Sequence, residues 1–207
     1  MARPRAATFD DQRTQILAAA ARLFATRGYT ATTMHAVAAA CGVRKPTLYH
    51  YVRDKHDLLA QISADHVARL EALVAAVQAE RLAPEARLRT LIRRFMLAYA
   101  DAEHAHRVLT EDVKFLAPAE QQAVLDGQRR VVAAFAQSIV ALRPELRAAQ
   151  LATPLAMLLF GMINWTFTWL KAGGALTHET LAPVVEQLFF GGLSAVRGAA
   201  AQPAAAR

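Results

Sequence analysis

One stretch near the start of the chain carries side chains that could contact a polyanion. Threonine and tyrosine hydroxyls alternate there with basic groups, and the residues concerned are Lys45, Pro46, Thr47, Tyr49, His50, Tyr51 and Lys55. Hydroxyl groups donate to phosphate oxygens, lysines neutralise them, and the carbon atoms of proline and threonine can meet thymine methyl groups. The chemistry that this stretch favours is recognition of nucleic acid rather than cleavage of a bond.

The spacing within this stretch predicts a short helix with one inward and one outward side. At about 100° per residue, Leu48 and Val52 share the inward side. The residues expected to point outward are Pro46, Thr47 and His50, flanked by Tyr49 and Tyr51. With the preceding short helix and the turn at Gly42, residues 32–59 have the layout of a helix-turn-helix.

The charge of the chain is concentrated at the same end. The 207 residues carry a net charge of +7, and residues 1–59 hold nine Lys and Arg against four Asp and Glu. Five of the seven excess positive charges therefore lie in about the first quarter, which indicates a basic module joined to a nearly neutral remainder.

Composition favours an all-α fold. Apolar residues make up 55% of the chain, Gly and Pro are sparse, and helical periodicity recurs without any alternating strand pattern. We expect about nine helices. The expected division is an N-terminal helix-turn-helix domain of three helices over residues 1–54, a helical ligand-binding and dimerisation domain over 55–197, and a disordered tail over 198–207.

Several classes of function are disfavoured. The single Cys excludes a disulfide framework, and the first residues lack an apolar leader, so we expect a cytoplasmic protein. His104 and His106 face different directions on a helix and are poor joint metal ligands, so we expect no metal and no cofactor. No nucleophile–base pair or nucleophile elbow is visible, so we expect no enzyme; a thioester-acting enzyme stays a minor alternative.

The stretch GVRKPTLYHYVRDKHDLL and the preceding ATRGYTATTMHAVAAACG resemble the N-terminal DNA-binding domain of the TetR family of one-component bacterial regulators. The resemblance implies an all-α homodimer that binds a double-stranded DNA operator. It assigns phosphate contacts to Thr33 and Lys55, and major-groove contacts to Lys45, Pro46, Thr47, Tyr49 and Tyr51. His35 stands where TetR itself has an arginine that reads a guanine, and His50 is more typical of the wider family.

The second half contains an uncharged stretch, residues 148–170. It is long enough to cross a bilayer, which leaves a membrane-associated DNA-binding regulator as an alternative. Its polar residues and the lack of a flanking basic cluster favour instead a helix buried in a core or a dimer interface, without a membrane partner.

The segment LLFGMINWTFTWLKAGGALTHETL, residues 158–181, resembles the acyl-CoA-responsive branch of the same family. The aromatic residues of this segment have three possible roles: binding an acyl-CoA, binding a different apolar effector, or packing alone. Arg93, Arg94, Lys114, Arg129, Arg130 and Lys171 are available cations for a CoA. The candidate effector-binding residues are His66, Phe95, Tyr99, Phe135, Phe160, Asn164, Trp165, Thr168 and Trp169.

The last two expected helices, about 148–172 and 180–197, are expected to form a four-helix interface with a second copy. The residues expected at that interface are Leu188, Phe189, Gly191, Gly192 and Leu193. A symmetric dimer would place two recognition helices about 34–36 Å apart, matching a palindromic operator. The sequence thus predicts a homodimeric transcriptional repressor that a small effector releases from DNA.

Overall fold

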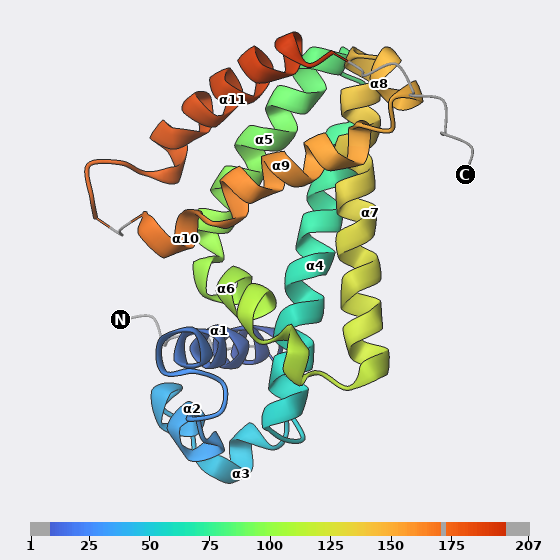
Figure 1. Ribbon diagram of the computed structural model, residues 1–207. Coiled ribbons are helices and arrows are strands. Elements are labelled where there is room, and N and C mark those ends of the chain that lie inside the picture. Colours follow the sequence, from blue (N-terminus) through green and yellow to red (C-terminus); the bar gives the residue numbers. More distant parts are fainter. Residues whose placement is uncertain (1–8, 171–172, 198–207) are drawn as a thin grey trace, which may run out of the picture. The chain divides into compact units, whose positions relative to one another are not determined.

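The computed structural model describes residues 9–170 and 173–197, and these residues are helical with no strand among them (Figure 1). Two expectations, the tail 198–207 and the phosphate contact of Lys171, lie outside the described residues. The helices in chain order are α1 (Phe9–Arg27), α2 (Met34–Ala40), α3 (Lys45–Leu48), α4 (Lys55–Ala79), α5 (Pro84–Asp101), α6 (Glu103–Glu111), the 3-10 turn η1 (Val113–Phe115), α7 (Pro118–Leu142), α8 (Glu145–Ala148), α9 (Ala152–Asn164), α10 (Thr166–Trp169) and α11 (His178–Ala195).

The chain forms two compact units, which differ from the domain division expected above. Among the described residues, unit 1 contains those up to Val67 together with Ala102–Leu125, and unit 2 contains Ala68–Asp101 and those from Asp126 onward. Residues 55–67 and 102–125 thus pack with the helix-turn-helix, whereas the expected division, which stays a prediction, places them in the second domain. The cause is packing, because Val108 and Leu109 of α6 are buried in the same core as α1.

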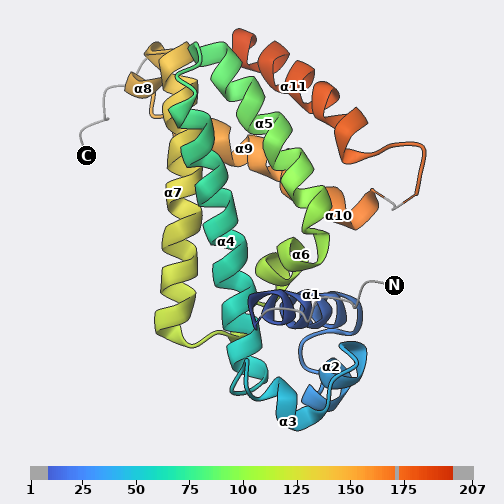
Figure 2. The same cartoon turned by 180° about the vertical axis from the view of Figure 1, so that it is seen from behind.

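The core of unit 1 supports the helix-turn-helix. Apolar residues at helical spacing on α1 are buried against α2, α3 and α6, and Figure 2 shows α6 lying against α1. Gly28 ends α1 with a φ of +87°, a conformation that glycine adopts without strain. Thr32 secures the following turn, because its buried hydroxyl donates to the Gly28 carbonyl across 2.9 Å.

The core of unit 2 is built around three phenylalanines from different helices. Phe95 of α5, Phe135 of α7 and Phe160 of α9 pack edge-to-face, with centroid separations between 4.8 and 6.0 Å. Helices α5 and α11 lie side by side (Figure 1), with Phe189 and Leu193 of α11 in the same core. Pro84 and Pro118 begin α5 and α7, as their first-turn preference predicts.

The long helix expected over residues 148–172 is interrupted. Gln150 adopts a φ of +55° between α8 and α9, and α9 ends at Asn164 before the single turn of α10. At the second break the hydroxyls of Thr166 and Thr168 donate to the Ile163 and Trp165 carbonyls, an alternative to the helical ladder. Among the described residues, no helix combines the length and apolarity needed to cross a membrane.

Candidate nucleic-acid interface

The recognition segment has the inward and outward sides expected from its sequence. Leu48 and Val52 are buried in the core of unit 1. The helix itself is shorter than expected, since α3 ends at Leu48 and the following residues form turns. The exposed residues are Lys45, Pro46, Tyr49 and His50, and the half-buried ones are Thr47 and Tyr51. The outward surface therefore combines one lysine with hydroxyl, imidazole and aromatic groups.

Two side chains on this segment are held by aromatic contacts. The Lys45 ammonium lies 5.8 Å from the centroid of the Tyr49 ring, and the Tyr51 ring stacks on Phe9 at the start of α1. Lys45 thus places its charge beside the Tyr49 ring on the exposed side of the segment.

Thr33 and His35 lie at the start of α2. The Thr33 side-chain oxygen accepts a hydrogen bond from the Ala36 N–H across 3.1 Å and caps the helix. Its own hydroxyl proton can still be donated to a phosphate oxygen. His35 is exposed on the first turn of the same helix.

The Lys55 side chain makes hydrogen bonds within the protein. Its ammonium donates to the carbonyl oxygens of Tyr29 and Thr30 across 3.0 and 3.1 Å, and lies 4.6 Å from the centroid of the Tyr29 ring. That ring in turn stacks on Phe115 of η1. Lys55 therefore fixes the turn after α1 to the start of α4, besides any phosphate it contacts.

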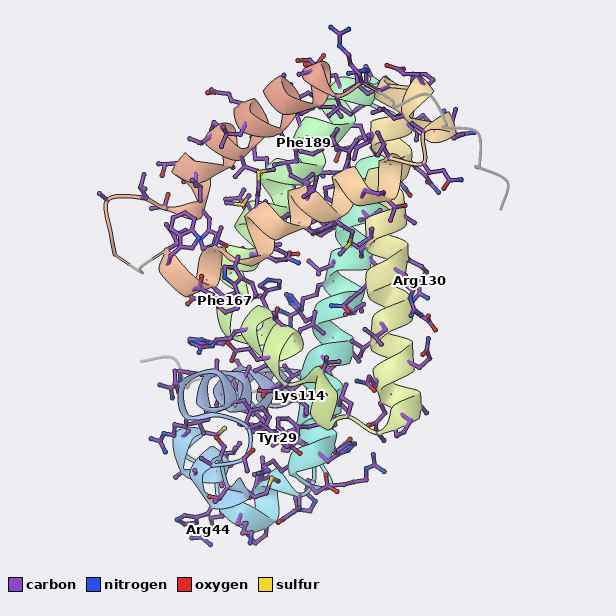
Figure 3. The ribbon with its side chains drawn as sticks, in the orientation of Figure 1. Tyr29, Arg44, Lys114, Arg130, Phe167 and Phe189 are labelled. Carbon is purple, nitrogen blue, oxygen red and sulfur yellow. The ribbon has the colours of Figure 1, made fainter. Side chains whose placement is uncertain are left out.

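Arg44 is a further basic residue of this surface, in addition to the contact residues expected from the sequence. It precedes α3 as its N-cap residue, makes no side-chain cap bond and is exposed; Figure 3 shows it at the outer edge of the helix-turn-helix. The available signal was its position directly before Lys45 in a basic segment.

Two aspartates fix the turn that follows the recognition segment. The Asp57 carboxylate accepts from the Arg53 N–H across 2.9 Å, and the Asp54 carboxylate accepts from the Asp57 N–H across 2.8 Å. Partial burial raises the pKa of Asp57, but the hydrogen bonds from the Arg53 backbone and side chain outweigh it, so the pKa lies below its usual value. This reciprocal cap begins α4 at a defined residue.

The candidate effector residues fall into three groups. Phe95, Phe135 and Phe160 form the aromatic centre of unit 2, and Tyr99 joins them with its ring edge against Phe95. The buried Tyr99 hydroxyl donates to Oδ1 of Asn164 across 2.8 Å. Burial raises the pKa of Tyr99, so this phenol stays protonated.

The indole pair is exposed. Trp165 and Trp169 are 58% and 50% exposed at the end of α9 and in α10, and Trp165 contacts Phe167 with centroids 5.9 Å apart (Figure 3 labels Phe167). Thr168 is exposed beside them.

His66 belongs to unit 1, whereas the other eight candidate effector residues belong to unit 2. It is buried beside His106, with Nε2 of His66 3.4 Å from Nδ1 of His106. The structure gives this histidine a partner on α6 rather than a place in the aromatic cluster.

Two family models match the chain. One describes bacterial regulatory proteins of the tetR family and matches residues 16–62; the other describes a tetracyclin repressor-like C-terminal domain and matches residues 81–193. The second match spans more than half of the chain. The chain belongs to the TetR family.

Relatives along nearly the whole length of this TetR-family protein are transcriptional regulators. A TetR-family regulator from Bordetella parapertussis 12822 is 32% identical, and the match covers 92% of this chain and 100% of that one with a TM-score of 0.83. The transcriptional repressor KstR2 of Mycolicibacterium smegmatis is 25% identical over 90% of this chain and 93% of its own. These relatives are not enzymes, and neither is this chain.

One further relative was solved with ligands. AibR, in complex with isovaleryl coenzyme A and operator DNA, is 26% identical, and the match covers 86% of this chain and 97% of AibR with a TM-score of 0.72.

The surface expected for dimerisation of the TetR-family protein is only partly as the sequence suggested. Leu188 is 64% exposed, and Gly191 and Gly192 are exposed on the same helix. Phe189 and Leu193, however, are buried in the core of their own unit, because α11 turns them toward α5 and α9. These two side chains therefore contribute to the core of the protomer, and their expected place at a dimer interface stays a prediction. The large apolar side chains exposed on α9 and α11 are Met157, Leu158, Val184 and Leu188, and Trp165 is exposed directly after α9.

Proposed function

We propose that this protein is a ligand-responsive repressor, which binds a palindromic operator as a homodimer and releases it when a small apolar or acyl-CoA-type effector binds unit 2. The observation that carries the proposal is the recognition segment, where buried Leu48 and Val52 hold Lys45, Tyr49 and His50 outward. Lysine and hydroxyl groups commonly contact the phosphate backbone and so position a protein on DNA. Outward polar side chains on a recognition segment can also contact base edges in the major groove.

The homodimer is supported by the apolar side chains exposed on α9 and α11. Leu158 and Leu188 are both more than half exposed, and Gly191 and Gly192 add no side-chain bulk on the same helix. Burial of this exposed apolar area against a second copy of the chain would stabilise a dimer. A two-fold axis then supplies the second recognition segment that a palindromic operator requires.

The chemistry of the aromatic cluster favours an uncharged buried group on the effector. Phe95 contacts Phe135, Phe160 and Tyr99, and the Tyr99 hydroxyl is hydrogen-bonded to Asn164 beside these rings. Burying a carboxylate among such rings is costly unless a cation pairs with it, whereas an acyl carbonyl can accept the Tyr99 hydrogen bond. This favours a thioester over a free acid, and isovaleryl coenzyme A, with which AibR was solved, is a ligand of that chemistry.

The arginines considered for CoA phosphates already have carboxylate partners. Arg94 pairs with Glu80, Arg130 pairs with Glu71, and Arg93 pairs with Glu186. The phosphates of a CoA would compete with these carboxylates, so we assign most of the selectivity to the acyl part.

Effector binding must favour a conformation with lower DNA affinity. A preference of about 1 to 3 kcal/mol for that conformation weakens operator binding roughly 5- to 150-fold. Since α4 runs from Lys55 beside the recognition segment to Ala79 in unit 2, it is the helix whose displacement would connect the two events.

The test begins with a random DNA pool, from which the purified protein is expected to select a palindromic duplex. Gel shifts on that duplex then compare short-chain acyl-CoAs with the matching free acids and with coenzyme A alone. We expect release by a thioester and none by the free acid. Failure to select any duplex contradicts the proposed function, while release by the acid contradicts the effector class.

Variants separate effector binding from DNA binding. Trp165→Ala and Trp169→Ala should change the effector concentration needed for release more than the DNA affinity, and Tyr49→Ala should abolish operator binding without loss of helicity. If both tryptophan variants show the same effector titration as the wild type, the indoles do not belong to the effector site.

A further inference from the structure

The first helix begins directly against the recognition segment. Phe9, the first residue of α1, stacks its ring on that of Tyr51, with centroids 4.6 Å apart and planes inclined by 26°. Both residues belong to unit 1. The contact joins two positions that are far apart in the sequence and that no helical periodicity connects.

Packing in the core does not account for Phe9. Its side chain is 59% exposed, whereas the core positions of α1 begin at Ile16. A large apolar ring kept at the surface gains little from burial, so its contact with one particular tyrosine is its distinguishing feature.

Tyr51 is half-buried against the core of unit 1, and its side chain makes a ring contact with the stacked Phe9. Helix α3 ends at Leu48, and Tyr51 follows in a turn, where its N–H donates to the Leu48 carbonyl across 3.0 Å. Tyrosine rings outside a helix sample several rotamers, and ordering one of them at an interface costs free energy. A ring that is already stacked loses less freedom when DNA binds.

Direct binding of phosphate by Phe9 is disfavoured by its neighbour. The exposed carboxylate of Asp10 follows it in the chain and repels a phosphate group. A role of Phe9 in DNA binding is therefore expected to act through its ring contact with Tyr51 and not through a phosphate contact.

We propose that Phe9 is a positioning residue for operator recognition, which holds the Tyr51 ring in the orientation that meets the DNA. This inference rests on the proposed function. It adds a residue outside the helix-turn-helix to the determinants of sequence preference, because the start of α1 sets the geometry of a side chain at the end of the recognition segment.

The experiment is a double-mutant cycle on the duplex that the wild-type protein selects from a random pool. The variants are Phe9→Ala, Tyr51→Ala and the double variant, with Phe9→Tyr as the conservative replacement that keeps a stacking ring. We expect Phe9→Ala to weaken binding of the selected duplex about 3- to 10-fold and Phe9→Tyr to restore it. In the Tyr51→Ala background, Phe9→Ala should have no further effect.

Two readouts separate positioning from a general loss of structure or charge. Affinity for a scrambled duplex and the salt dependence of binding should be unchanged in Phe9→Ala, since no phosphate contact is removed. Equal affinity of Phe9→Ala and wild type for the selected duplex, or an undiminished effect in the Tyr51→Ala background, overturns the inference. Failure of the wild-type protein to select any duplex overturns the proposed function instead.

Discussion

The Tyr99 hydroxyl donates a hydrogen bond to Oδ1 of Asn164 across 2.8 Å and so joins α5 to the last residue of α9. The bond lies beside the aromatic centre of unit 2, and the Tyr99 ring contacts Phe95 edge-on at 6.0 Å. Because α9 breaks immediately after Asn164, this bond holds the break at a fixed place against α5. It is also the polar group that an acyl carbonyl would meet.

Tyr99→Phe removes the donor and keeps the ring. We expect the free energy of unfolding to fall by about 1 kcal/mol, the usual contribution of such a bond. Urea denaturation followed by circular dichroism measures it. Tyr29→Phe is the matched control, because the contacts of Tyr29 are made by its ring and backbone carbonyl, and it should change stability by less than about 0.5 kcal/mol. Equal losses in the two variants would contradict the role given to the Tyr99 bond.

Lys45 and Lys55 should behave differently although both are lysines of the recognition region. Lys45 is exposed, so Lys45→Gln should lower the slope of log affinity against log salt by about 0.9 and leave the melting temperature unchanged. Lys55→Gln should also lower the melting temperature, since the Tyr29 and Thr30 carbonyls lose their donor. Thermal melts and salt titrations on the same preparations distinguish the two, and a fully stable Lys55→Gln protein would disprove the structural part.

The lowered pKa of Asp57 predicts an acid-dependent part of the stability. The unfolded carboxyl takes up its proton near pH 4, whereas the folded one, accepting from Arg53, does so only at lower pH. The stabilisation is thus complete above about pH 4 and is lost as pH falls through the folded pKa. Asp57→Asn should reduce this acid dependence in denaturation curves, while Asp101→Asn, at an exposed position, should keep it. Identical acid profiles for wild type and Asp57→Asn would contradict the assignment.

Neighbouring residues of α11 should separate dimerisation from folding. Leu188 is exposed, so Leu188→Arg should give a folded monomer in light scattering after size exclusion. Phe189 is buried in the protomer, so Phe189→Ala should instead lower the free energy of unfolding by about 3 to 5 kcal/mol. A dimeric Leu188→Arg protein would exclude this face as the interface.

Local order was available from the sequence. The helical spacing of Leu48 and Val52 determined which side of the recognition segment faces the core, and Pro84 and Pro118 marked the first turns of α5 and α7. Periodicity and first-turn chemistry act over a few residues, so they can be seen in one stretch of chain. The same locality made the segment recognisable as part of a TetR-family DNA-binding domain.

Other features depended on contacts between distant segments. Two distant parts of the chain must meet before Lys55 can bind the Tyr29 carbonyl or Phe9 can stack on Tyr51. The same holds for the packing of α6 against α1. Phe189 and Leu188 are adjacent and both apolar, yet only the packing of α11 decided which is core and which is surface. A sequence specifies the side chain at each position, whereas the partner that it meets is fixed only when the whole chain packs.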